Sequence, residues 1–197
     1  MTSRLYAVIF NGPPGSGKDF AVNYLNISPN TAHVTMKQKL LEIASIIHNI
    51  DFFAIWEDGR KKDEPLKELD GVTPREEVIR ISEEIIKPHY GKAYFGKNAA
   101  QSIRDLSDAG VANVFLFSDG GFIDEILPIT EVVDEVILIH LSREGCDFSD
   151  DSRDYIDYFE LLERSRGADV KLRHIENCGT DAFYKKLVTQ VEEGQSV

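Results

Sequence analysis

The stretch Gly12-Pro13-Pro14-Gly15-Ser16-Gly17-Lys18-Asp19 decides the fold predicted for this chain. It follows an apolar run at residues 5–10 that is typical of a buried strand. It precedes residues 20–25, whose apolar positions have helical spacing. A strand, a glycine-rich loop and a helix in this order form the setting that a phosphate-binding loop requires. The stretch therefore predicts a loop that binds the polyphosphate of a nucleotide, and a turn that merely joins strand to helix is the alternative.

The residue types in this loop suit a polyphosphate. Gly12, Gly15 and Gly17 allow the backbone to curl so that successive N–H groups point inward. The helix that follows adds free N–H groups and the positive end of its dipole, and Lys18 supplies a mobile charge for the outer phosphates. Asp19 stands where serine or threonine is usual. Because an acid beside a triphosphate needs a cation between them, we expect Asp19 to be a ligand of Mg²⁺ or of a Mg²⁺-bound water.

Composition excludes some classes of partner. The 197 residues carry a formal net charge of −12 and a sequence pI near 4.8, which argues against nucleic acid or an anionic membrane as the main partner. No apolar run approaches the roughly 18 residues that a membrane crossing needs. Cys146 and Cys178 match no metal-binding spacing. Reduced thiols and a cytoplasmic location, in the host cytoplasm if the protein is viral, are therefore expected.

Strands and helices are expected to alternate along the whole chain. The five expected strands are residues 5–10, 31–36, 111–117, 133–141 and 169–175. This alternation predicts an α/β fold, specifically a three-layer P-loop NTPase fold with a central parallel five-stranded sheet. We expect one domain over residues 1–197, with an acceptor-binding excursion at about 37–110 and an arginine-containing lid at about 143–168.

Helix boundary signals divide the excursion. Residues 37–50 have helical spacing, and residues 51–72 are expected to be irregular. Thr73 begins the next helix with a capping box, and Pro88 is expected to end it. A helix at residues 95–109 follows, and a short one after Phe122 is expected to stop at Pro128.

Several charged residues are candidates for the site. Lys39 and Arg75 lie in first helical turns, where the helix dipole disfavours cations, so they are expected to face an anion; ordinary solvated side chains are the alternative. Asp119 follows a buried strand, at the sheet edge where open α/β folds bind ligands, although a helix cap would explain it too. The lid arginines, of which Arg153 is one, fit closure over phosphates, or they pair with local acids.

Four stretches together resemble the bacteriophage-type deoxynucleoside monophosphate kinases. The first is the glycine loop with aspartate after the lysine, which P-loop phosphomevalonate kinases share. The second is Thr73-Pro74-Arg75 continuing to Glu84 and Lys87, which is similar to an acceptor helix of the T-P-R…E…R pattern. The remaining two are Ser118-Asp119-Gly120-Gly121-Phe122-Ile123-Asp124-Glu125, similar to S-D-V-R-F-x-x-E, and Asn177-Cys178-Gly179-Thr180, similar to N-x-G-T.

The resemblance implies a role for each matched position. The residues that it places at ATP are Gly12, Pro13, Gly15, Ser16, Gly17, Lys18 and Asp19, with Asn177, Gly179 and Thr180 against the adenine. It places the acceptor at Lys39, Arg75, Lys87, Asp119 and Phe122, with Glu84 orienting one of the cations. It implies that Arg143 and Arg153 neutralise the transferred phosphoryl beside Lys18, and that Asp119, with Asp19, lies at the metal.

Two departures from the family pattern bear on the acceptor. Gly121 replaces an arginine, and Lys87 stands where arginine is usual. A lysine is a point charge and cannot reproduce the bidentate grip of a guanidinium. The identity of the acceptor is therefore less constrained than the kinase chemistry.

The leading hypothesis is transfer of the γ-phosphoryl of ATP, with Mg²⁺, to a (deoxy)nucleoside monophosphate, and it leaves a homodimer open. A first alternative is a kinase for another small acceptor, a nucleoside or a phosphorylated metabolite. A hydroxyl acceptor needs a base, for which Asp119 is the candidate. A second alternative is a nucleotide-binding module without catalysis.

Overall fold

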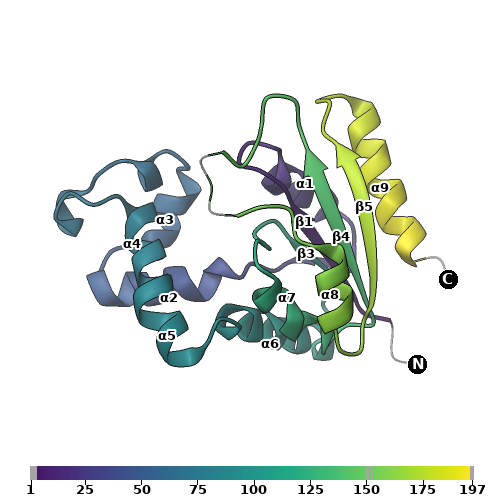
Figure 1. The fold of residues 1–197 in the computed structure, drawn as a ribbon, viewed down its shortest axis with the longest axis horizontal. Helices are drawn as coiled ribbons and strands as arrows, with labels where there is room; N and C mark the ends of the chain where they lie inside the picture. Colours follow the sequence, from purple (N-terminus) through teal and green to yellow (C-terminus); the bar gives the residue numbers. More distant parts are fainter. Residues whose placement is uncertain (1–3, 150, 152, 196–197) are drawn as a thin grey trace.

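The computed structural model describes residues 4–149, 151 and 153–195, so Asp150 and Ser152 of the expected lid lie outside it. Five strands form one parallel sheet in the order β2-β3-β1-β4-β5 (Figure 1). Their bounds are β1 Tyr6–Asn11, β2 Thr31–His33, β3 Val114–Phe117, β4 Glu135–Ser142 and β5 Asp169–Glu176. The α/β fold with a five-stranded parallel sheet, predicted from the alternation of apolar runs, is confirmed.

Strand β1 lies at the centre of the sheet. All six of its residues are buried, as expected for a strand of a parallel sheet that helices cover on both faces. It pairs with β3 on one side and β4 on the other, and Tyr6 is level with Val114 and Glu135. The carboxyl ends of these three strands therefore meet at one edge of the sheet, the edge at which open α/β sheets bind ligands.

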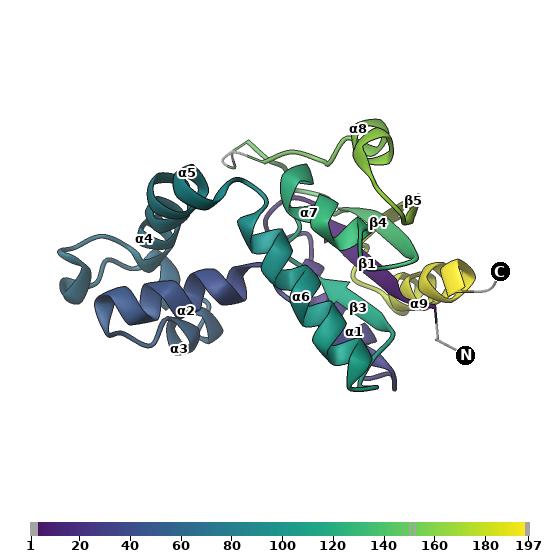
Figure 2. The ribbon, with the colours of Figure 1, turned by 90° about the horizontal axis from the view of Figure 1, so that it is seen from below.

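Helices cover both faces of the sheet and make three layers (Figure 2). On one face, α1 (Lys18–Leu25) and α9 (Asp181–Gln195) pack against Val8 and Phe10 of β1. The helices on the other face are α6 (Tyr94–Asp108), α7 (Ile123–Thr130) and α8 (Tyr158–Arg164). Burial of apolar side chains between each helix layer and the sheet supplies the main stabilising free energy of this arrangement.

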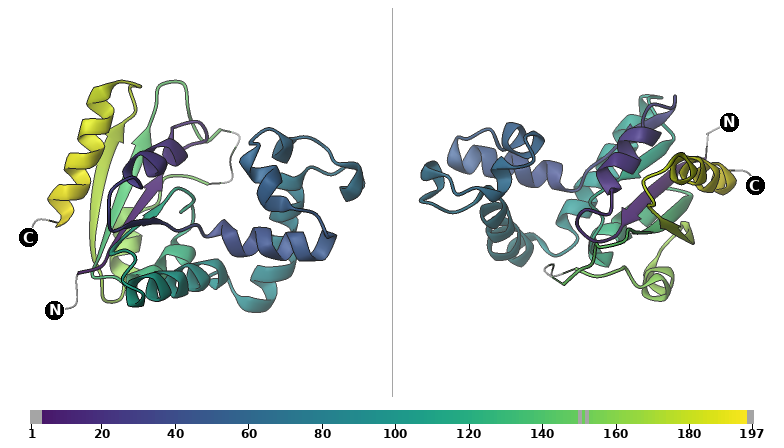
Figure 3. Two further views of the ribbon diagram at one scale, coloured as in Figure 1. Left: turned by 180° about the vertical axis from the view of Figure 1, so that it is seen from behind. Right: turned by 90° about the horizontal axis from the view of Figure 1, so that it is seen from above.

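A group of helices stands beside the sheet, and we call residues 37–90 the helical arm (Figure 3). Its elements are α2 (Lys37–His48), α3 (Phe52–Glu57), the 3₁₀ turns η1 (Lys61–Asp63) and η2 (Lys67–Leu69), α4 (Pro74–Arg80), the π-helix η3 (Ile81–Ile86) and α5 (Lys87–Tyr90). The capping box expected at Thr73 is present: its side chain accepts from the Glu76 N–H, and the Glu76 carboxylate accepts from the Thr73 N–H.

The structure corrects three local predictions. Residues 51–72 are not wholly irregular, because Asp51 caps α3 by accepting a hydrogen bond from the Ala54 N–H (3.1 Å), and Phe52 is fully buried. Pro88 does not end the helical run, which continues to Tyr90. The wider turn of η3 directly before Pro88 accommodates a residue that has no N–H and crowds the preceding turn. Pro128 likewise lies inside α7.

No helix among the described residues combines the length and apolar character that crossing a membrane requires.

Candidate phosphate-binding site

The glycine loop connects the carboxyl end of β1 to the first turn of α1. Gly15 and Gly17 have φ angles of 76° and 99°, which residues with a side chain rarely adopt. Gly12 is required for a different reason, since a Cβ atom there would collide with the carbonyl oxygen of Leu141 in β4. The glycine spacing therefore satisfies backbone geometry and close packing at the sheet edge.

Backbone donors of this loop are free. Within the described part of the chain, the N–H groups of Gly15, Gly17 and Lys18 make no hydrogen bond to a protein acceptor. The Ser16 N–H donates to the carbonyl oxygen of Pro13 at 3.2 Å, and the buried Ser16 hydroxyl has no partner. Free amide donors at the start of a helix form a site suited to an anion.

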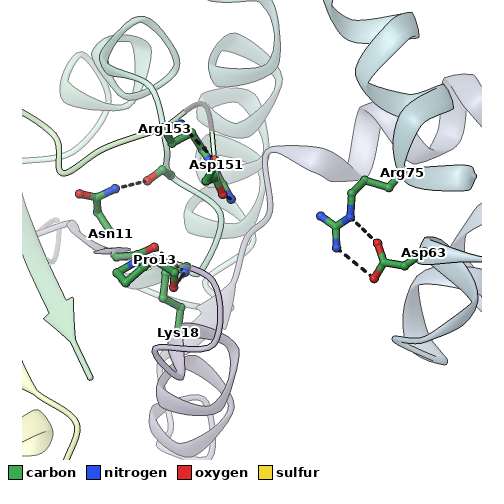
Figure 4. A network of polar contacts seen from close by, with 9 residues as sticks. Asn11, Pro13, Lys18, Asp63, Arg75, Asp151 and Arg153 are labelled. Carbon is green, nitrogen blue, oxygen red and sulfur yellow. Dashed lines mark hydrogen bonds and ion pairs between the residues drawn. The ribbon is translucent and has the colours of Figure 1, made fainter. Parts of the chain in front are cut away.

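Lys18 folds back over its own loop. Its Nζ donates to the carbonyl oxygens of Gly12 (2.6 Å) and Pro13 (2.8 Å) (Figure 4). Burial lowers the pKa of Lys18 to about 8, and the positive charge of Arg153 contributes in the same direction. A bound polyanion would favour the charged form of this ammonium group, because opposite charges nearby raise the pKa of a lysine.

Two distant segments are fastened to the loop. The side chain of Asn177, in the turn between β5 and α9, donates to the carbonyl oxygen of Ser16 at 2.8 Å. In the same turn, the Gly179 N–H donates to the Asn177 side chain, and the Thr180 carbonyl oxygen accepts from the N–H of Phe183. Arg143, after β4, donates to the carbonyl oxygen of Gly15 at 3.3 Å. The structure thus brings Arg143 and Asn177, both predicted site residues, to the phosphate loop.

Arg153 approaches the same edge of the sheet and forms a two-pronged ion pair with Asp151. Its Nε lies 2.7 Å from one carboxylate oxygen of Asp151, and its Nη2 contacts the other (Figure 4). The hydrogen bonds to Asp151 have the largest effect on the pKa of Arg153 and raise it. The negative charges of Asp119 and Glu125 raise it further. The side chain also covers Gly121: a Cβ atom at that position would lie 2.6 Å from Cδ of Arg153. The space above Gly121, where the S-D-V-R-F pattern that this segment resembles has arginine, is thus filled by the side chain of Arg153.

Asp119 lies where predicted, at the carboxyl end of β3, and its carboxylate caps α2. It accepts hydrogen bonds from the hydroxyl of Thr35 and from the N–H groups of Met36 (3.2 Å) and Lys37 (3.0 Å). A carboxylate at a helix N-terminus satisfies free N–H donors and interacts favourably with the dipole. Asp119 therefore joins the sheet edge to the helical arm, and its role at a metal or an acceptor stays a prediction.

The predicted role of Asp19 at a magnesium ion requires the ion to be bound together with a nucleotide. Among the described residues, no group of three or more His, Cys, Asp and Glu side chains could hold a metal. Mg²⁺ bound with a nucleotide needs only one or two carboxylates, since phosphates and water supply its other ligands. Asp19 is exposed in the first turn of α1. Burial lowers the pKa of His33, and the charges of Asp119 and Asp19 oppose that shift, so both carboxylates lie near one side chain.

A pocket of about 380 Å³ lies where the end of the helical arm meets the segment after β3. Its lining residues are Glu83, Lys87, Pro88, Lys92, Phe122 and Asp124. Lys87 is largely buried, lies over the Phe122 ring at 4.5 Å, and pairs with Glu83 at 2.7 Å. Lys87 and Phe122, both predicted to bind the acceptor, are therefore brought together in one cavity.

The buried carboxyl of Glu125 does not line this pocket but lies 3.5 Å from Nζ of Lys87, which does. Burial raises the pKa of Glu125 to about 7, although Lys87 acts in the opposite direction. The nearby charge of Asp119 raises the pKa further. Near neutral pH this carboxyl can therefore hold or accept a proton beside Lys87.

The other predicted acceptor residues are not brought together. Lys39 pairs with Glu42 (2.7 Å) in α2, and Arg75 pairs with Asp63 (2.5 Å) across the arm. Figure 4 shows this second pair apart from the group around Lys18. The Glu84 side chain is exposed and makes no hydrogen bond or ion pair with another described residue.

Two further arginines within residues 143–168, Arg164 and Arg166, have their described partners away from the glycine loop. Arg164, in α8, pairs with Asp124 (2.5 Å) and with Glu160 (2.7 Å). The N–H of Arg166 donates to the Thr130 hydroxyl at 3.2 Å, beside the end of α7. By contrast, Arg143 donates to the glycine loop, and the charge of Arg153 lowers the pKa of Lys18.

Two residues that sequence reasoning missed hold the segment around Arg153. Asn11, the last residue of β1, donates to the carbonyl oxygen of Gly120 (3.4 Å) and accepts from the Ile156 N–H (2.8 Å). His140, near the end of β4, contacts the carbonyl oxygen of Ile156 through Nε2 at 3.0 Å. A buried asparagine at the end of an apolar strand was the available signal, because a buried amide needs partners.

Comparison with solved structures gives distant likenesses. No protein-family model and no curated protein sequence matches the chain. Among solved structures, the chain is similar to an unliganded sugar kinase from Janibacter sp. HTCC2649, with a TM-score of 0.48 and 12% identity over 97% of this chain and 94% of that one. It is also similar to a candidate kinase from Chloroflexus aurantiacus J-10-fl, with a TM-score of 0.46 and 11% identity over 98% and 99% of the two chains. We base no functional conclusion on similarities at this level.

Proposed function

We propose that this protein is an ATP-dependent phosphotransferase that moves the γ-phosphoryl group of ATP to the phosphate of a (deoxy)nucleoside monophosphate. The observation that carries the proposal is the loop at residues 12–18, which combines free amide donors with the ammonium group of Lys18 at the end of a central parallel strand. A second basic group, Arg153, is close enough for its charge to lower the pKa of Lys18. Two cations and several amides at one point suit the charge of a triphosphate.

Each residue has a simple role in this proposal. The loop amides and Lys18 hold the donor phosphates, and Asn177, Gly179 and Thr180 form the turn next to the adenine. Arg143 and Arg153 neutralise charge on the transferred group. Mg²⁺ bound with ATP near Asp19 would screen the repulsion between donor and acceptor phosphates. A monophosphate acceptor is nucleophilic at neutral pH, so alignment and charge neutralisation suffice and no general base is needed.

The acceptor is expected in the pocket between Lys87 and Phe122. The ammonium group of Lys87 suits a phosphate, and the exposed Phe122 ring offers a face on which a base can stack. Lys39 and Arg75 would contribute only after leaving their carboxylate partners. This pocket supports a small acceptor and does not by itself specify the base or the sugar.

The experiment is an acceptor screen with the purified full chain. ATP and Mg²⁺ are supplied with each common ribo- and deoxyribonucleoside monophosphate, and formation of ADP and of the acceptor diphosphate is measured by chromatography. Lys18→Ala is expected to lower turnover by at least about 100-fold, the loss typical of one preorganised charge-stabilising donor. No transfer to any monophosphate would refute the proposal. ATP binding that depends on Lys18, without any transfer, would support a non-catalytic module.

A hydroxyl-bearing acceptor is the second candidate function, and Glu125 is the observation that favours it. A hydroxyl nucleophile needs a base with a pKa near the working pH. The Asp119 carboxylate is occupied by three donors at the start of α2, whereas Glu125 is buried beside the pocket with a pKa of about 7. If nucleosides or sugars are phosphorylated in the same screen and Glu125→Gln abolishes that transfer, this second candidate replaces the first.

A further inference from the structure

The position of Arg153 depends on contacts that span the chain. We call residues 153–157 the strap. The Ile156 N–H of the strap is bound by Asn11 of β1, and its carbonyl oxygen contacts His140 of β4. The hydroxyl of Tyr155 donates to the carbonyl oxygen of Leu141 at 3.2 Å. The backbone that carries Arg153 is therefore fixed to the carboxyl ends of two central strands.

The Arg153 side chain runs over a position at which the segment after β3 has no side chain. A Cβ atom at Gly121 would lie 2.6 Å from Cδ of Arg153 and 3.5 Å from its Cγ. Gly121 does not have a positive φ angle, so its backbone conformation does not require glycine. What requires glycine at this position is the space that the arginine occupies.

Asp151 holds the far end of the same side chain. Both of its carboxylate oxygens contact the guanidinium, and it also accepts from the Arg153 N–H at 3.0 Å. The positive charge of Arg153 lowers the pKa of Lys18, and the negative charge of Asp151 partly offsets this effect. Two cations thus face one space, and an anion entering that space would relieve their repulsion.

We propose that Gly121 and Asp151 are positioning residues that hold the guanidinium of Arg153 beside Lys18, where it takes hold of the phosphates of the bound nucleotide. This inference rests on the proposed function. Phosphate oxygens take over from the Asp151 carboxylate as partners of the guanidinium, since both offer paired oxygens to the planar fork of an arginine. Gly121 acts by leaving room, and Asp151 acts by orienting the side chain before the nucleotide arrives.

The test is a double-mutant cycle on Gly121 and Arg153. Arg153→Ala is expected to lower kcat by about 100-fold or more, by analogy with the loss of other phosphoryl-neutralising arginines. Gly121→Ala is expected to lower kcat by about tenfold while the thermal unfolding midpoint stays near that of the wild type, because a flexible side chain and not the backbone must move. In the Arg153→Ala background, Gly121→Ala should change nothing further. Additive losses would overturn the inference.

Gly120→Ala is the matched control. A Cβ atom at Gly120 would lie 2.5 Å from Cγ2 of Ile9, in the core, and it would not meet Arg153. This variant should lower the unfolding midpoint, because overpacking a core is destabilising. The opposite pattern, with Gly121→Ala unfolding early and Gly120→Ala losing turnover selectively, would contradict a positioning role for Gly121.

A second readout is independent of turnover. ATP affinity at one fixed pH should fall in both Arg153→Ala and Gly121→Ala, because each variant takes the guanidinium away from the phosphates. In the Arg153→Ala background, Gly121→Ala should lower the affinity no further. If the wild type transfers no phosphoryl group, the proposed function fails while this loss of affinity still tests the positioning. If ATP affinity is the same in all three proteins, or ATP does not bind, the positioning is refuted.

Discussion

The cations at the edge of the sheet and those of the helical arm are held in different ways. Lys18 and Arg153 are partly buried. Their polar partners are near in sequence, but the side chain of Arg153 also lies over Gly121, in the segment after β3. Lys39 and Arg75 are more exposed, with 41% and 46% of the side-chain surface accessible, and each pairs with an acid at most twelve positions away.

This difference indicates which part of the site is ready for an anion before the ligand arrives. At the sheet edge, free amides and the ammonium group of Lys18, which is held by carbonyl oxygens, already converge. Of the two cations there, Arg153 is the one that must exchange a carboxylate, that of Asp151, for phosphate. In the arm, each cation must first give up a carboxylate. Exposed ion pairs are worth about 0–1 kcal/mol, so that exchange requires little free energy. We therefore expect the donor site to be preorganised and the acceptor site to be completed by binding.

The largest effect that we expect is on the pH dependence of stability, and it comes from Glu125, which lies where the arm meets the sheet. Its pKa is raised from 4.5 to about 7, so the folded state binds a proton more tightly than the unfolded state does. The resulting stability is fully present below pH 4.5 and is lost as the pH rises to about 7. At about 1.4 kcal/mol for each pKa unit, the loss approaches about 3 kcal/mol. It is measured as the difference in unfolding free energy between wild type and Glu125→Gln from pH 4 to 8.

The control for this prediction is Lys87, which lowers the pKa of Glu125. Lys87→Met should raise that pKa and move the region of falling stability to higher pH. A constant difference between wild type and Glu125→Gln over this pH range would show that Glu125 titrates normally. The junction between arm and sheet would then not be the low-dielectric site that its burial indicates.

Much of the fold, and part of the site, could be predicted from the sequence. The five strands were found because parallel strands are continuous apolar runs, and the glycine loop between β1 and α1 was located because its residues are consecutive. Helix α3 was missed because six residues are too few for periodicity to show. The contact between Gly121 and Arg153 could not be predicted, since the two residues are 32 positions apart and only the folded chain brings them together.

Asp119 illustrates a residue whose position was predictable and whose contacts were not. The end of a buried strand beside glycines indicated the sheet edge. That the start of α2 would lie against it, with Thr35, Met36 and Lys37 all donating to its carboxylate, depends on the path of the chain after β2. The position of Asp119 is compatible with both roles predicted from the sequence, that of a site residue and that of a helix cap.

An intermediate effect is expected on breaking the link between the two regions at Asp119. Asp119→Ala removes the acceptor of three hydrogen bonds, two of them from N–H groups at the start of α2, and should lower the unfolding free energy by about 2 kcal/mol. Denaturant unfolding measures this loss. Asp119→Asn keeps one acceptor oxygen and should lose less. If Asp119→Asn is as stable as the wild type but transfers no phosphoryl group, the carboxylate acts at the metal or the acceptor as well as in capping.

The smallest expected effect concerns Arg75 and its partner. Because their ion pair is exposed, Arg75→Ala and Asp63→Ala should each change the unfolding free energy by less than about 0.5 kcal/mol. Their kinetic effects should have opposite signs if Arg75 leaves Asp63 to bind the acceptor phosphate. Arg75→Ala should raise the acceptor KM by about tenfold, the loss of one charge-assisted contact, whereas Asp63→Ala should lower it slightly. Steady-state kinetics on the acceptor found by the screen decides between these cases. An unchanged KM in both variants would make the pair a surface ion pair only, and recognition of the acceptor phosphate would then fall to Lys87 in the pocket.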